Sequence, residues 1–137
     1  MSFTRFKSLS PIERQAILPA LMRLLVARAV LTLGIQKASK WLGGQIRQSG
    51  SNYDSQLWGA RTRVLHGLSA RIPGVACLAH SLALRWWMRS QGHDARMVIG
   101  VCKTSGKLES HAWVQIGEQI MIEKEVNIAR FRVINHY

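Results

Sequence analysis

The chain has 137 residues, which is enough for one globular domain and too few for two ordinary ones. Apolar residues make up 47% and charged residues 19% of the sequence, which excludes a disordered chain. The net charge of +12 fits three partner classes: nucleic acid, an anionic membrane surface, or an acidic protein or peptide. Because residues 1–15 carry no secretory signal, we expect a cytoplasmic protein whose two cysteines are free thiols.

The first predicted element is a long helix over Pro11 to Leu42. Ser10 and Glu13 form an S-x-x-E capping box at its start. Apolar residues occupy most of its sides, which is typical of a helix that packs in the core and also faces a partner. Arg23 and Arg28 interrupt the apolar run, and each would cost about 2.5–3.5 kcal/mol at the middle of a bilayer. We therefore expect no transmembrane span.

A polar stretch at residues 45–56 predicts a loop within a single domain, 1–137. The loop completes an N-terminal helical region, 1–56, and a core region at 57–137 follows it. Two further helices are predicted in the core region, at Leu57 to Ile72 and at Cys77 to Arg89.

After Gly92 the apolar period changes to two residues, which indicates strands. Strands are predicted at Ala95–Val101, His111–Ile116 and Gln119–Val126, with a hairpin turn at Gly117-Glu118. Helices followed by antiparallel strands predict an α+β fold.

Cys77 opens the third predicted helix directly after a Pro-Gly break. Free backbone N–H groups and the helix dipole stabilise a thiolate at such a position, which favours a nucleophile. Free cysteines are also among the most buried residue types, so position alone supports a packing role equally well. Cys102 ends a predicted strand without a helix start, and we expect it to be a packing residue.

His111 begins a predicted strand, and the aromatic Trp113 lies on the same face of it. A Cys–His pair requires the imidazole to lie within hydrogen-bond reach of the sulfur. Taken alone, His111 is more simply interpreted as a histidine on a half-exposed strand face.

A third group should orient the imidazole, and Glu123 is the first candidate. A two-residue turn would pair Glu123 with Ala112 and direct it away from the His111 face, whereas a three-residue turn or a bulge would align the two. Glu125 and Asn127 have the same parity as Glu123 and are the alternatives.

Three stretches of the chain together resemble a known family. Cys77–Leu84, the strand end Ile99-Gly100-Val101 and Ser110–Val114 match, in this order, the transglutaminase-like cysteine peptidases of lasso peptide biosynthesis. The resemblance implies a papain-like or transglutaminase-like core, in which the helix bearing the cysteine packs on an antiparallel sheet bearing the histidine.

The family resemblance implies that Cys77 is the nucleophile and His111 the general base, and Glu123 stands where the family usually has an aspartate. It implies a cysteine endopeptidase that removes the leader peptide from a ribosomally made precursor before macrolactam closure. The implied partners are the leader peptide, a separate leader-recognition protein and an ATP-dependent lasso cyclase. His80 stands where the family commonly has a longer polar residue, and we expect it on the helix surface or lining a pocket.

Two other functions are compatible with the sequence: a basic, non-enzymatic module that binds RNA or an anionic membrane, and an acyltransferase that uses the same Cys–His site. The tryptophans lie in apolar contexts without an RNA-stacking motif, so we expect no nucleic acid partner. We expect no metal, because paired metal-ligand spacings are absent from the sequence, and no cofactor. His93 and Asp94 are expected to cap the turn at Gly92.

Overall fold

The computed structural model describes residues 9–43, 53–71, 77–117, 119–121 and 131–137. In this part of the chain, four helices precede a four-stranded antiparallel sheet, which confirms the predicted α+β class. The elements are α2 (Pro11–Leu31), α3 (Ile35–Trp41), α4 (Ser55–Ser69), α5 (Cys77–Ser90), β1 (Ala95–Thr104), β2 (Lys107–Ile116), β3 (Gln119–Met121) and β4 (Arg132–His136).

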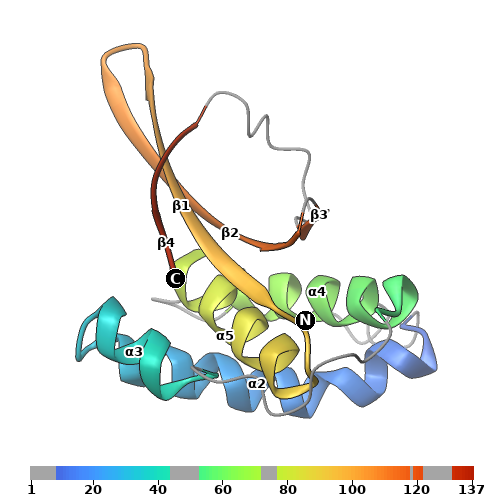
Figure 1. Cartoon of the computed structure of the whole chain (residues 1–137). Helices are drawn as coiled ribbons and strands as arrows, with labels where there is room; N and C mark the ends of the chain where they lie inside the picture. The colour runs from blue at the N-terminus through green and yellow to red at the C-terminus, as the bar shows by residue number, and fades with distance from the viewer. Residues whose placement is uncertain (1–8, 44–52, 72–76, 118, 122–130) are drawn as a thin grey trace.

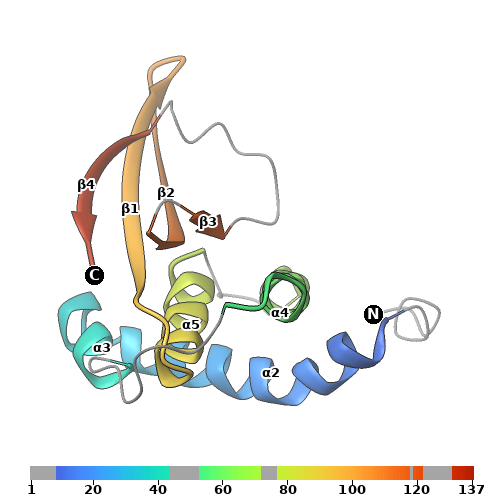
Figure 2. The same ribbon diagram turned by 45° about the vertical axis from the view of Figure 1, so that its right-hand side comes forward.

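The elements form layers around α5 (Figure 1). This helix lies between α2 on one side and the sheet on the other, with α4 beside it (Figure 2). The sheet order is β3-β2-β1-β4, and each neighbouring pair is antiparallel. The core lies where α5 meets these neighbours, and it includes Leu82, Leu84, Met97 and Val114. The packing of α5 therefore fixes the place of its first residue, Cys77, relative to the sheet.

The single helix predicted over Pro11 to Leu42 is wrong, because the chain forms two helices there. A turn at Thr32–Gly34 separates α2 from α3. Gly34 has a φ of 99°, a left-handed conformation in which a right-handed helix cannot continue. The predicted capping box is confirmed: the Glu13 N–H donates to Ser10 Oγ at 3.2 Å, and the Ser10 hydroxyl donates to Glu13 Oε1 at 3.0 Å. None of the helices described is long and apolar enough to cross a bilayer.

The other predicted boundaries agree with the structure to different degrees. α5 ends one residue later than predicted, whereas α4 begins two residues earlier, because the Asp54 carboxylate accepts the backbone N–H groups of its first turn. β1 and β2 are longer than predicted and meet at a Ser105-Gly106 turn. β4 was not predicted, and the predicted strand at Gln119–Val126 lies outside the described residues beyond Met121.

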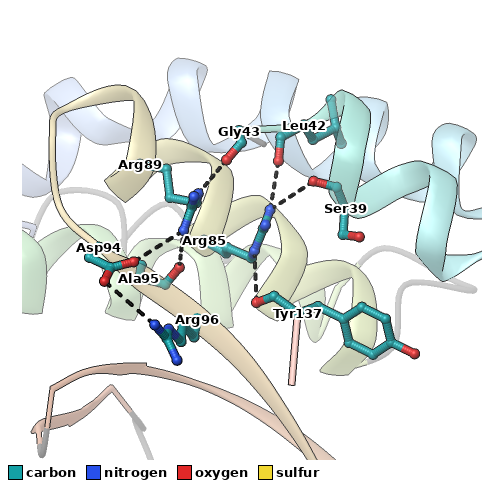
Figure 3. A network of polar contacts seen from close by, with 9 residues as sticks. All are labelled: Ser39, Leu42, Gly43, Arg85, Arg89, Asp94, Ala95, Arg96 and Tyr137. Carbon is teal, nitrogen blue, oxygen red and sulfur yellow. Dashed lines mark hydrogen bonds and ion pairs between the residues drawn. The ribbon is translucent and has the colours of Figure 1, made fainter. Parts of the chain in front are cut away.

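Two arginines of α5 connect the helices to the sheet (Figure 3). Arg85 donates to the backbone carbonyls of Ser39, Leu42 and Tyr137 at 3.1, 2.8 and 3.0 Å. Arg89 donates to the carbonyls of Gly43 and Ala95 and pairs with Asp94. One stretch of α5 thus donates hydrogen bonds to backbone carbonyls at the end of α3, at the start of β1 and at Tyr137.

Candidate active site

Cys77 is the first residue of α5, and its side chain is exposed. The N–H groups in the first turn of a helix have no partner within the helix, so they can stabilise an anion beside the sulfur. Cys102 instead lies within β1, half-buried, opposite Glu109 of β2. Of the two thiols, Cys77 is the one that a substrate can reach freely.

His111 lies on β2, opposite Gly100 of β1, and is surrounded by aromatic rings. Its ring stacks on Trp113 at a centroid distance of 6.1 Å and lies 5.9 Å from the ring of Phe131. A Cβ atom at position 100 would stand 2.9 Å from atoms of Trp113 and Phe131, so this aromatic cluster requires the glycine. Burial lowers the pKa of His111 below its usual 6.5, which favours the neutral ring that a general base needs.

Cys77 and His111 come from adjoining elements, but no hydrogen bond joins them. Side chains alternate along β2, so His111 and Trp113 share one face while Val114 enters the core from the other. The charge of His111 is a minor cause of the lowered pKa of His80, after burial and the charge of His66. Catalysis by this pair requires the imidazole ring and the sulfur to approach each other when substrate binds. Hydrogen bonds between catalytic groups are often long in enzymes without substrate and shorten in the complex.

His80 lies one helical turn after Cys77, and its Nε2 atom is buried with no hydrogen-bond partner among the described residues. Its ring meets the ring of His66 on α4 edge-on at 6.0 Å. Burial, followed by the charge of His66, lowers the pKa of His80 from 6.5 to about 4. His66 and His80 therefore lie in contact near the first turn of α5, although the described residues include no group of three side chains placed to hold a metal ion.

Comparison with family models matches residues 20–136 to the transglutaminase-like superfamily. The chain belongs to this superfamily. The match begins within α2 and ends in β4, so it includes both Cys77 and His111. Comparisons with curated proteins and with solved structures find no match to this chain. Because the superfamily includes cysteine peptidases and acyltransferases, membership supports thiol chemistry without choosing between the two.

The third catalytic position implied by the resemblance to the lasso peptide leader peptidases is Glu123, which lies outside the described residues, as do both alternatives. β3 pairs with β2 so that Gln119 lies opposite Ile116, which makes the turn between them two residues long. This register differs from the three-residue or bulged turn on which the alignment of Glu123 depends. A bulge after Met121 would be needed to direct Glu123 toward His111, and the role of Glu123 stays a prediction.

Several residues near the site in this transglutaminase-like domain were not found from the sequence. Gly100 had a signal, since an isolated glycine inside a strand often marks close packing. Phe131 and His66 had none, because they reach the site only through contacts between distant elements. His93, expected to cap the turn at Gly92, donates its backbone N–H to the Met88 carbonyl at 3.0 Å, and its buried side chain also accepts a hydrogen bond at Nε2 from the Trp58 indole at 3.1 Å.

The lowered pKa of His80 predicts that acid destabilises the fold. Between pH 6.5 and about 4 the unfolded chain binds a proton at this ring that the folded chain does not, so stability is full above pH 6.5 and is lost as the pH falls. We expect His80 to account for a loss of about 2 kcal/mol in the free energy of unfolding between pH 7.5 and pH 5.

Urea unfolding of His80→Gln at these two pH values checks this prediction. The variant should lose less stability on acidification than the parent, whereas His136→Gln, at an exposed histidine of β4, should behave like the parent. An equal loss in the parent and in His80→Gln would contradict the prediction.

Proposed function

We propose that this chain is a cysteine endopeptidase that removes the leader peptide from a lasso peptide precursor before macrolactam closure. The observation that carries the proposal is an exposed cysteine at the first residue of the central helix in a transglutaminase-like domain. His111, on the strand that packs against this helix, is the proposed general base. The proposal includes a cytoplasmic location and a single domain, 1–137, with its peptidase core at 57–137.

The proposed reaction begins when the Cys77 thiolate attacks the carbonyl carbon of the last leader residue, while His111 holds the proton of the thiol. The backbone N–H of Cys77 faces the oxyanion that forms. The C–N bond then breaks, and His111 protonates the amine that leaves on the core peptide. Water, deprotonated by His111, attacks the thioester, which releases the leader as a carboxylic acid and restores the thiol. The free amine on the core peptide is the group that a cyclase needs to close the macrolactam.

The proposal includes three partners: the leader peptide of the precursor, a separate leader-recognition protein and an ATP-dependent lasso cyclase. The net charge of +12 supports binding to an acidic peptide or protein. Electrostatic association of this kind weakens as the salt concentration rises.

Reconstitution tests the proposal directly. The purified chain is incubated with the precursor and the leader-recognition protein in water enriched in ¹⁸O, and the products are analysed by mass spectrometry. The expected products are a core peptide with a free amine and a leader whose new carboxylate carries ¹⁸O. An intact precursor, with all partners present and folded, would contradict the proposal.

Acyl transfer is the second candidate function, because the superfamily also includes acyltransferases. The same assay separates the two functions when a primary amine is added. A peptidase gives mainly the leader acid, whereas an acyltransferase gives mainly the leader amide.

The proposed role of Glu123 predicts that Glu123→Gln lowers the rate of cleavage by about tenfold or more. A carboxylate beside the imidazole fixes the tautomer and stabilises the imidazolium, and an amide does so less well. Cys77 should still be alkylated in this variant, which separates loss of the base from loss of the fold. Glu125→Gln is the matched control and should cleave normally. If Glu125→Gln or Asn127→Ala is the slow variant instead, the role belongs to that residue.

A further inference from the structure

A pocket of about 490 Å³ lies between the start of α2 and the second half of α4. Its volume is in the range of sites that bind small ligands or peptide side chains, roughly 300–1,000 Å³. The pocket plays no part in the chemistry proposed above. Its walls include the apolar residues Leu9, Ile17, Val64 and Leu68, with the charged residues Glu13, Arg63 and Arg71 among the others.

Gly67 of α4 lines this pocket and has no packing reason to be a glycine. A Cβ atom built there would meet no atom within 4 Å, although glycine is a weaker helix former than any residue except proline. Gly100 differs, because a Cβ atom there would stand 2.9 Å from its neighbours. The bare backbone at Gly67 leaves room for a ligand to lie directly against α4.

The pocket lies close to the helix that carries the nucleophile. His66 lines the pocket, and its ring contacts that of His80, which lies one helical turn after Cys77. Arg71, also in the lining, precedes Cys77 by six residues, so the chain between them spans at most about 20 Å. A peptide held in this pocket can therefore extend to the sulfur.

The charges of the lining favour a ligand that carries a carboxylate. Glu13 is already engaged, because it accepts the Ser10 hydroxyl and lies 4.0 Å from the Arg63 guanidinium. Arg71 is exposed and makes no ion pair with any residue that the structure describes. The pocket thus combines an apolar wall with an unpaired positive charge.

We propose that this pocket binds the peptide substrate, with an apolar side chain between α2 and α4 and a neighbouring carboxylate of the same peptide paired with Arg71. The identity of the peptide as a substrate rests on the proposed function. The pocket then gives the enzyme a preference for an apolar residue next to an acidic one, close to the bond that is cleaved.

The test uses binding alone, with a library of random 12-residue peptides as the probe. The Cys77→Ala chain is immobilised so that bound peptides are not cleaved, and the retained peptides are sequenced by mass spectrometry. Each pocket variant is made in this background: Gly67→Leu, which fills the pocket, and Arg71→Glu, which reverses its charge. Lys107→Glu is the control, since it makes the same charge change at the distant β1–β2 turn.

The Cys77→Ala chain should enrich peptides in which an apolar residue adjoins an acidic one. Gly67→Leu should reduce that enrichment tenfold or more, Arg71→Glu should abolish the acidic preference and keep the apolar one, and Lys107→Glu should match the parent. Absence of this enrichment in the parent, or equal enrichment in Gly67→Leu, would overturn the proposal. If thermal melting shows that Gly67→Leu is unfolded, the result with Arg71→Glu decides the test. An acidic preference in Arg71→Glu equal to that of the parent would then overturn the proposal.

Failure of the pocket is distinguishable from failure of the proposed function. Pocket-dependent peptide binding by a chain that never cleaves precursor would refute the peptidase and leave the pocket as a peptide site. Precursor cleavage with the same KM in Gly67→Leu and the parent would refute the pocket and leave the peptidase intact.

Discussion

Cys77→Ala is expected to abolish cleavage of the precursor while leaving the fold unchanged. The sulfur is exposed and takes part in no hydrogen bond between described residues, so its removal creates neither a cavity nor an unpaired group. Without the nucleophile there is no thioester intermediate, and loss of a nucleophile of this kind lowers the rate by about 10⁴-fold or more. Cleavage followed by mass spectrometry, together with thermal melting of both proteins, measures the two expectations.

Cys102→Ala is the matched control for this experiment. Cys102 is half-buried within β1, and its removal should cost some stability while most of the activity remains. Normal cleavage by Cys77→Ala would refute the mechanism. An inactive but folded Cys102→Ala would show that the wrong thiol had been assigned.

The parts of the fold that the sequence predicted well have local signals. α5 begins at Cys77 after a Pro-Gly break, repeats apolar residues at helical spacing and ends just before Gly92, so its limits are visible in the chain itself. The pairing of Ile116 with Gln119 between β2 and β3 is local in the same sense. The break at Gly34 could not be predicted from the sequence, because one glycine in an apolar run is compatible with a continuous helix. Only its φ of 99° shows that the helix ends there.

β4 is a strand that local sequence patterns do not predict. All five of its residues are exposed, so no buried alternation marks it as a strand. It forms because its backbone pairs with β1, and the Tyr137 and Met97 backbones exchange two hydrogen bonds at 2.8 Å just beyond it. Such pairing between distant segments depends on the fold as a whole.

The candidate site also contains residues with local sequence signals and residues placed by contacts between distant elements. The position of Cys77 at the start of α5 follows from neighbouring residues and was predicted. His80 was expected on the helix surface or lining a pocket, and its Nε2 atom is buried. Its contact with His66 depends on how α4 packs on α5, and the spacing of apolar residues in the sequence carries no information about that packing. The position of His111 relative to Cys77 likewise depends on how β2 packs against α5.

Arg85→Met is expected to destabilise the fold severely, although the residue lies apart from the proposed chemistry. Arg85 is 5% exposed and pairs with no Asp or Glu side chain among the residues described. Burial, with a smaller contribution from the charge of Arg89, lowers the pKa of Arg85 to about 10, so the side chain stays charged at neutral pH. Its charge is stabilised by the backbone carbonyls that it binds (Figure 3).

Two of these carbonyls, those of Ser39 and Leu42, belong to the C-terminal end of α3, where a helix leaves its own acceptors without donors. The guanidinium supplies both donors from a neighbouring element. Methionine fills similar space but donates no hydrogen bond, so both carbonyls lose this donor. Because each unsatisfied buried group costs about 1–3 kcal/mol, we expect the free energy of unfolding to fall by about 3 kcal/mol or more.

Urea unfolding of Arg85→Met, Arg85→Lys and Arg96→Met measures this effect. Arg85→Lys keeps the charge, but a single ammonium cannot reach the carbonyls of α3 and of Tyr137 together, so it should lose stability by a smaller amount. Arg96→Met is the control, because Arg96 is exposed, lies 3.9 Å from the exposed Asp94 and should change stability by less than about 0.5 kcal/mol. If Arg85→Met is as stable as Arg96→Met, the guanidinium does not hold α3 against α5, and α3 must be retained by its apolar contacts alone.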